Sequence, residues 1–379
     1  MWAYGCVTFS WKIMIKFASI IAMSIASVTY AEYYDTKRFE WVGGNFDWPC
    51  ETTKNMYKSS GRYISKNVIA TRAVIYKDEA IVTLPRFKSG VPATLAKLPL
   101  KNRLGIQPLL KPFPSWSYQE EDDCDALQSA VDVFLDPHTI LWVLDTGVVR
   151  SLEDPIRTCP PKVVAINLKT GKVVKTILLD EMATPSSRLQ YVTADYSGDG
   201  RVFVYVTDAA SRAILVYDVT SDRSYRMILP KIVTAGAATP DVLYSVLLRR
   251  SDGSACLVFT YLGGDRIFSL LTNKLRNGTS VGNVNDLGSK PKKMVFLGTD
   301  GGSVMYFRYE GDSAVYRWDT NHSFDLENFE KVYSGHECSL TTQVTADGKR
   351  ARVRIMESNF PDFFQGTVGV GVEHALIII

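Results

Sequence analysis

The sequence predicts an all-β protein, and more specifically a six-bladed β-propeller. Segments with the 3.6-residue period of an amphipathic helix are nearly absent. Runs of four to seven β-branched and aromatic residues recur instead, bounded by Gly, Asp, Asn and Pro. Six units, each a turn followed by such a run, align on one turn aspartate each: Asp78, Asp136, Asp199, Asp252, Asp300 and Asp347. By subtraction these aspartates lie 47 to 63 residues apart, a spacing typical of propeller blades.

Each unit contains more than one strand. The first reads "KDEAIVTLPRF" and continues, after a short basic loop, into "VPATLAKL". Later units repeat the scheme, as in "SGDGRVFVYVTD" followed by "AILVYDVTSDRSY". A sheet of three or four such strands cannot bury both of its faces alone, so the sheets must stack on one another around a closed ring.

The N-terminus has the pattern of a secretory signal peptide. Lys12 and Lys16 precede an apolar run over residues 17–28, and Ala31 supplies a small residue at the expected cleavage site. We expect residues 1–31 to be the signal, with residues 1–13 as an upstream extension if translation starts at Met14. A buried helix or membrane anchor is the alternative. Residues 32–379 are then one secreted, extracellular propeller domain with no membrane segment.

Charge and motifs exclude several function classes. The formal net charge of +3 is small and the charges are interleaved, which does not favour a nucleic-acid partner. Gly-rich phosphate loops and Rossmann or Walker fingerprints are missing, so no cofactor is expected. The four histidines lack metal-ligand spacing and no CxxC occurs, so no metal site is expected.

Five cysteines remain after the signal, an odd number that leaves at least one free thiol. We expect two bridges, Cys124–Cys159 and Cys256–Cys338, because each joins neighbouring segments. Two sequons, at Asn277 and Asn321, fit N-glycosylation in the secretory route.

Several linked motifs resemble one known family. The stretches "VTLPRFKSGVPATLAKLPL", "PSWSYQ", "CDALQSAVDVFLDPHTILWVLDTGVV" and "CPPKVVAINLKTGKVV" are similar to the Yellow/major royal jelly proteins of insects. The resemblance implies a secreted six-bladed propeller. It also implies one of several roles, because members are linked to melanin pigmentation and dopachrome conversion, to binding of biogenic amines, or to nutrition. The family's usual partners of Cys124 and Cys159 are absent here, which makes a bridge between these two a substitute.

Candidate ligand-binding residues come from the repeat itself. Counting nine residues from each turn aspartate reaches aromatic and acidic side chains, which we expect to end the innermost strands around one mouth of the central channel. With two neighbours near the C-terminus, the candidates are Phe87, Asp145, Asp208, Tyr261, Tyr309, Asn359 and Phe360. A carboxylate there, Asp145 or Asp208, would pair with an ammonium group, and the rings would hold a catechol or indole. The alternative is structural, with Asp capping a turn and the rings packing between blades.

Three functions remain open from the sequence. The first is binding of a small aromatic amine or catechol metabolite at the channel mouth. The second is a tautomerase-like conversion of dopachrome with a rim carboxylate as proton shuttle, although no catalytic residue can be named. The third is a structural, nutritional or cuticle-associated role without a small ligand. The oligomeric state is not predicted.

Overall fold

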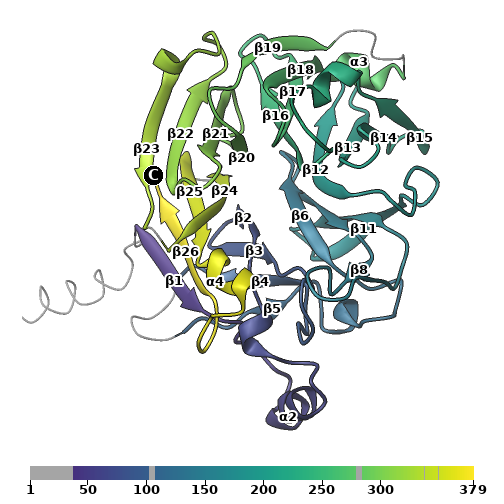
Figure 1. Ribbon diagram of the computed structural model, residues 1–379. Coiled ribbons are helices and arrows are strands. Elements are labelled where there is room, and N and C mark those ends of the chain that lie inside the picture. Colours follow the sequence, from purple (N-terminus) through teal and green to yellow (C-terminus); the bar gives the residue numbers. More distant parts are fainter. Residues whose placement is uncertain (1–36, 102–106, 279–283, 337, 349) are drawn as a thin grey trace, which may run out of the picture.

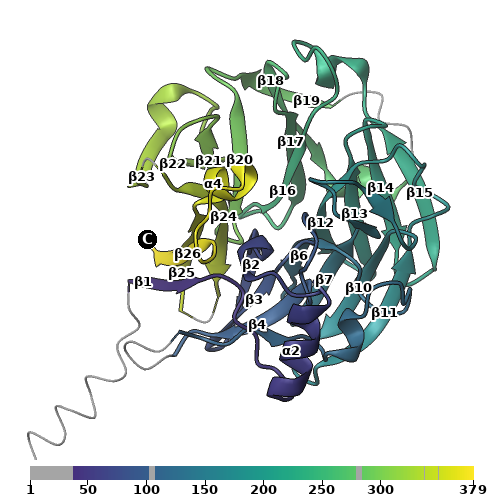
Figure 2. The ribbon, with the colours of Figure 1, turned by 60° about the horizontal axis from the view of Figure 1, so that its bottom comes forward.

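The computed structural model describes residues 37–101, 107–278, 284–336, 338–348 and 350–379; the expected signal peptide lies outside them. The described residues form six four-stranded antiparallel sheets and one two-stranded sheet. The six larger sheets are arranged as blades around a central axis (Figures 1 and 2). The predicted all-β, six-bladed propeller is therefore confirmed.

Each of the first five blades is built from its innermost strand outward. The first contains β2 (Arg72–Tyr76), β3 (Glu79–Thr83), β4 (Leu95–Pro99) and β5 (Lys111–Pro112). The second contains β6 (Ala130–Leu135), β7 (Ile140–Asp145), β10 (Lys162–Asn167) and β11 (Lys172–Leu178). The third contains β12 (Leu189–Tyr196), β13 (Val202–Asp208), β14 (Ala213–Asp218) and β15 (Arg223–Ile228).

The fourth and fifth blades repeat this order. The fourth contains β16 (Leu243–Arg249), β17 (Ala255–Tyr261), β18 (Arg266–Leu271) and β19 (Asn285–Ser289). The fifth contains β20 (Met294–Thr299), β21 (Val304–Tyr309), β22 (Ala314–Asp319) and β23 (Phe329–Ser334). A two-stranded sheet, β8 (Val148–Val149) with β9 (Ile156–Arg157), lies in the loop between β7 and β10.

The sixth blade closes the ring by joining the two ends of the described chain. It contains β24 (Leu340–Asp347), β25 (Arg352–Ser358), β26 (Glu373–Ile378) and, outermost, β1 (Arg38–Val42). Figure 2 shows β1 in purple beside β26 in yellow. An ion pair of 2.8 Å between Arg38 Nη1 and Glu357 Oε1 fastens β1 to β25. Because β1 supplies the missing fourth strand, the last blade has the same size as the others.

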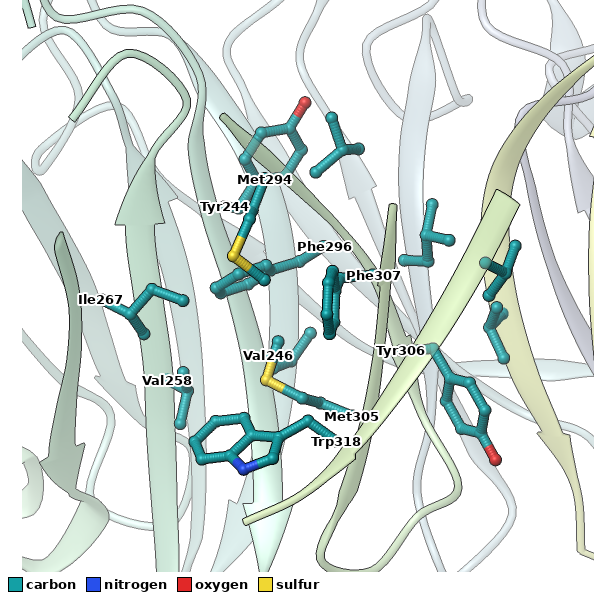
Figure 3. Packing of buried hydrophobic residues seen from close by; sticks show 14 of the residues in the cluster. Tyr244, Val246, Val258, Ile267, Met294, Phe296, Met305, Tyr306, Phe307 and Trp318 are labelled. Atoms are coloured by element: carbon teal, nitrogen blue, oxygen red, sulfur yellow. The ribbon is translucent and has the colours of Figure 1, made fainter. Parts of the chain in front are cut away.

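The apolar faces of neighbouring blades form the core. Between the fourth and fifth blades, Val246 on β16 and Val258 on β17 belong to one buried cluster with Phe296, Met305 and Trp318 of the next blade (Figure 3). These residues come from the runs of β-branched and aromatic residues that the sequence shows between turns. Burial of such side chains stabilises the ring by about 1.5–3 kcal/mol for each one fully buried.

Helices are short and peripheral. They are α2 (Glu51–Ser59), α3 (Thr272–Arg276) and α4 (Phe360–Gln365), with 3₁₀ turns η1 (Ser65–Asn67), η2 (Ser117–Gln119), η3 (Lys231–Thr234) and η4 (Leu326–Asn328). Helix α2 projects away from the blades (Figure 1). It begins after Cys50, whose sulfur accepts a hydrogen bond from the amide of Thr53, the usual role of an N-cap.

The disulfide expectations are half correct. Cys124 and Cys159 are bonded, with an S–S distance of 2.02 Å. The expected bridge between Cys256 and Cys338 is wrong, because both side chains are free. Cys256 is buried near the start of β17, whereas exposed Cys338 precedes β24. Second strands and first strands run in opposite directions, so the two cysteines lie at opposite ends of their blades.

Candidate functional site

The innermost strands β2, β6, β12, β16, β20 and β24 lie around the central axis (Figure 2). Two pockets lined by these strands form a central channel. The turn aspartates lie where each innermost strand turns into the second strand of its blade. Counting forward from them therefore leads along the second strands, not the innermost ones. Four candidates, Asp145, Asp208, Tyr261 and Tyr309, end the second strands of their blades, one strand farther from the axis than expected.

The two candidate ammonium partners are buried inside loops. Asp145 ends β7 with no exposed surface, and its carboxylate accepts hydrogen bonds from the amides of Gln128 and Ser129, both at 2.8 Å. Asp208 ends β13 and accepts from the amide of Arg188 at 2.9 Å and from the hydroxyl of Ser187 at 2.6 Å. Neither carboxylate lines the channel, so the ammonium-partner role expected for them does not hold in this structure. Both have the structural role, fixing the loop beside their strand.

Three further candidates are also engaged elsewhere. Tyr261 is fully buried, and its hydroxyl donates to the carbonyl of Ala209 at 2.6 Å. Tyr309 packs on the rings of the fifth blade. Asn359 accepts a hydrogen bond from the amide of Glu373 at 2.9 Å and precedes helix α4. These side chains hold loops and blades together.

The remaining candidates, Phe87 and Phe360, reach the channel. They border a pocket of about 250 Å³ at the end where the innermost strands begin. We call this space the mouth pocket; its lining residues are Thr71, Arg72, Phe87, Val131, Tyr191, Tyr244, Val295, Arg308, Leu340, Thr341, Thr342 and Phe360. Two of the seven sequence-derived candidates thus meet there, from the first and sixth blades.

A larger space, about 570 Å³, occupies the other end of the channel. We call it the wide compartment; it is lined within residues 72–77, 132–139, 191–193, 245–249, 296–301 and 343–348. Its volume is in the range of small-molecule sites, about 300–1,000 Å³. The walls are largely aliphatic, with rings of Tyr76, Phe134 and Phe296.

A polar partition separates the two spaces. Arg72 and Tyr191 line both, and the Arg72 Nη2 donates to the Tyr191 hydroxyl at 3.3 Å. Arg72 Nη1 donates to the carbonyl of Thr342 at 2.5 Å, and its Nε lies 3.5 Å from Asp132 Oδ1. The guanidinium therefore bridges β2, β12, β24 and β6 across the axis.

Asp132 is the buried carboxylate of the wide compartment with the fewest partners. Its Oδ2 accepts one hydrogen bond, from the amide of Val192 at 2.8 Å, and the pairing with Arg72 is long. Burial raises the pKa of Asp132 to about 6, against the opposing effects of Arg72 and of the amides of Val192 and Val133. Asp136, by contrast, is saturated by the amide of Ile140 and by Trp142 and Tyr196.

Neutral polar groups line the same compartment as Asp132. Thr193, Ser245, Gln343 and Thr345 line the wide compartment from β12, β16 and β24. Gln343 uses its carbonyl oxygen to accept from the amide of Ala73, which leaves its NH₂ facing the compartment. Such groups orient a ligand by hydrogen bonds without adding charge.

Sequence reasoning missed Asp132, although a signal for it exists. In "AVDVFLD" the positions of Asp132, Phe134 and Asp136 alternate, so they share one face of a strand. All three line the wide compartment. A carboxylate in the middle of an apolar strand is expensive to bury, which is itself a mark of a functional or paired position.

The fold and channel define a class: six-bladed β-propellers with a small-molecule-sized central cavity. A family model described as major royal jelly protein matches residues 128–374, from the start of the second blade to the last strand. The chain belongs to this family.

Curated relatives agree. "Protein yellow" of Drosophila erecta is 25% identical over 278 residues, covering 69% of this chain and 51% of the relative. "Protein yellow" of Drosophila yakuba is 26% identical over 275 residues, covering 68% and 51%, and that of Drosophila melanogaster is 24% identical over 278 residues, covering 69% and 51%. The chain thus spans about half the length of these relatives.

Among solved structures, the Cps50 (Swd1) β-propeller domain of Myceliophteria thermophila aligns with a TM-score of 0.42 and 9% identity, covering 82% of this chain and 84% of that one. Within the described residues, no helix has the length and apolar character needed to cross a membrane.

Proposed function

We propose that the protein binds a small aromatic amine of the catechol or indole type in the wide compartment, with Asp132 as the ammonium acceptor. This proposal depends on the surroundings of Asp132. Its buried carboxylate lines a ligand-sized cavity, accepts a hydrogen bond from the amide of Val192 and forms a long ion pair with Arg72. A ligand ammonium would supply the charge-assisted hydrogen bond that burial has removed from water. The proposal keeps the ligand class expected from the sequence at the channel mouth, but moves the site to the other end of the channel and makes Asp132 the acceptor.

The rest of the compartment suits the ring of such a ligand. Tyr76 and Phe134 offer aromatic surface for stacking. The hydroxyls of Thr193 and Ser245 and the amide of Gln343 lie on other strands, where they can bond to catechol or indole polar atoms. The chain belongs to a family whose members are linked to amine binding and to pigmentation, and this supports the same ligand class.

Replacing Asp132 with asparagine should weaken dopamine binding ten- to a hundredfold, because a buried ionic hydrogen bond contributes about 1.5–3 kcal/mol. Isothermal titration with dopamine and serotonin measures this. In the unaltered protein, affinity should also fall as the pH drops below about 6, where the Asp132 carboxyl becomes protonated and loses its charge.

Asp286→Asn is the matched control, since Asp286 lies exposed on the outer strand β19 and pairs there with Arg266. It should leave the titration unchanged. Absence of heat with both amines at high protein concentration would sink the amine hypothesis and favour a structural or nutritional role. An unchanged affinity in Asp132→Asn would remove Asp132 from it.

A second candidate function, dopachrome conversion, is favoured by the same side chain. A carboxyl with a pKa of about 6 is suited to exchanging protons near neutral pH, and the Arg72 guanidinium beside it can steady a developing negative charge. If this function holds, dopachrome absorbance should decay faster than in buffer, and Asp132→Asn should remove the excess rate. A rate equal to buffer leaves binding alone.

We infer that the protein is secreted and glycosylated, supported by the Cys124–Cys159 bond and two exposed sequon asparagines. Asn277 follows helix α3, and Asn321 lies after β22. Asn321 donates to Ser303 Oγ at 3.0 Å, a bond that a glycan would compete with. Expression of the full chain in insect cells should yield medium-borne protein whose gel mobility rises after peptide-N-glycosidase treatment. Asn277→Gln should remove part of that shift, and protein retained in the cells unglycosylated would contradict the inference.

A further inference from the structure

The two ends of the channel differ in charge. The wide compartment contains Asp132 and Asp136 beside its cations. The mouth pocket has two arginines, Arg72 and Arg308, and no aspartate or glutamate among the described residues that line it. Arg72 is already paired with Asp132 across the partition. The uncompensated positive charge of the mouth pocket therefore resides on Arg308.

Arg308 is a buried cation held in place by neutral groups. The residue is 8% exposed, on β21. Its Nε donates to the carbonyl of Thr341 at 3.0 Å and its Nη1 to the carbonyl of Tyr309 at 3.2 Å. Among the described residues no carboxylate lies within ion-pair distance of it, and Nη2 has no hydrogen-bond partner. Burial lowers the pKa of Arg308, which shows how poorly the site solvates its charge.

Polar groups without partners surround this guanidinium. The Oγ1 of Thr341 is buried and makes no hydrogen bond to any residue that the structure describes. Tyr244, a residue 8% exposed, lines the same pocket, and its hydroxyl makes no hydrogen bond to a residue that the structure describes. Buried polar groups are ordinarily satisfied, so the open Thr341 hydroxyl, beside a cation that has no carboxylate partner in the described chain, indicates a missing acceptor.

Aromatic side chains close the pocket around these groups. Phe87 and Phe360 border it, and Tyr191 and Tyr244 have ring centroids 5.6 Å apart. Helix α4, which carries Phe360, is fixed by Lys88, whose Nζ donates to the carbonyl of Phe363 at 2.6 Å. A cavity of roughly 150 Å³ suffices for benzene, so about 250 Å³ holds a single ring with two small substituents.

We propose that the mouth pocket is a second binding site, for a small aromatic carboxylate, with Arg308 as the residue that selects the negative charge. A guanidinium presents parallel N–H groups to a carboxylate, and the surrounding rings take the apolar part of the ligand. The channel then binds ligands of opposite charge at its two ends. The site does not depend on the amine site proposed above, because Asp132 does not line it.

The test is a titration of the full folded protein with 4-hydroxybenzoate and with its neutral isostere 4-hydroxybenzamide. We expect the carboxylate to bind about tenfold or more tightly than the amide. Arg308→Gln should reduce 4-hydroxybenzoate affinity by a similar factor and leave the amide nearly unaffected. Arg317→Gln is the matched control, because Arg317 is half-exposed on β22 and pairs with Glu330.

Equal affinity for the acid and the amide in the unaltered protein overturns the proposal, and this comparison requires no variant to fold. Unchanged benzoate binding in folded Arg308→Gln overturns the role of Arg308.

Dopamine titration separates the two sites. Asp132→Asn should not weaken benzoate binding, and Arg308→Gln should not weaken dopamine binding. Failure of dopamine with retained benzoate binding rejects the amine site alone, and the reverse result rejects the carboxylate site alone.

Discussion

Replacing Arg86 with methionine should lower the free energy of unfolding by about 3–5 kcal/mol, because it leaves five buried backbone carbonyls without the guanidinium that donates to them. Arg86 is 2% exposed in the loop after β3. Its guanidinium donates to the carbonyls of Val91, Pro92, Gln119, Leu127 and Gln128. All five lie outside the strands, so methionine would leave these carbonyls buried without donors. Urea unfolding followed by tryptophan fluorescence measures the loss.

Two variants separate this effect from a general loss of arginine. Arg226→Met, on the exposed outer strand β15, should change stability by less than about 0.5 kcal/mol. Arg86→Lys keeps the charge but offers three donors, so it should fall between the two. A loss below about 1 kcal/mol in Arg86→Met would show that the carbonyls find other donors.

Arg86 also shows how far sequence reasoning reaches. The basic loop "LPRFKSGVP" resembles a ligand-binding rim in composition, yet its arginine is a structural cation. Its partners come from residues up to 42 positions away. Only the folded chain brings the carbonyls of residues 91–92, 119 and 127–128 together. A single sequence shows the charge but not the ring of acceptors around it.

The fold was predictable because the signal is local and repeated. Each turn aspartate sits beside a hairpin of β-branched residues, and six hairpins fix the blade number. Which strand of a hairpin faces the axis is not local. It depends on ring closure, where β1 joins β26. Both strands of a hairpin have the same alternation, so Asp145 on β7 and Asp132 on β6 look equally suited to a channel site.

What separates these two carboxylates is the surrounding backbone. Asp145 meets the amides of Gln128, Ser129 and Gly147, supplied by loops on either side of the hairpin. Asp132 faces the axis and meets one amide and one arginine. The hydrogen bonds around Asp145 occupy its carboxylate, whereas the carboxylate of Asp132 can still accept a hydrogen bond from a ligand. That difference arises from tertiary contacts between blades, which composition and period do not encode.

Acid should destabilise the ring closure through His374. This side chain, on β26, is 3% exposed, stacks on Trp41 of β1 at 4.7 Å, and accepts the amide hydrogen of Ala70 on Nε2 at 2.9 Å. Burial lowers the pKa of His374 to about 3. The unfolded chain, with an ordinary pKa near 6.5, binds a proton first as the pH falls. The stability is therefore fully present above about pH 6.5 and is lost progressively between about 6.5 and 3.

At pH 5 the loss attributable to His374 should be about 2 kcal/mol relative to pH 7.5. Asp132 acts in the opposite direction, because its pKa is raised to about 6 in the folded protein and its protonation there favours folding. The measurement is therefore a difference: urea unfolding at both pH values in the unaltered protein and in His374→Gln. Glutamine can accept the Ala70 hydrogen without titrating, so this variant should lose about 2 kcal/mol less on acidification. His322→Gln, at an exposed position, should keep the full loss. Equal losses of unfolding free energy in the unaltered protein and in His374→Gln would contradict this prediction. They would show that protonation of His374 does not weaken the contact between β1 and β26.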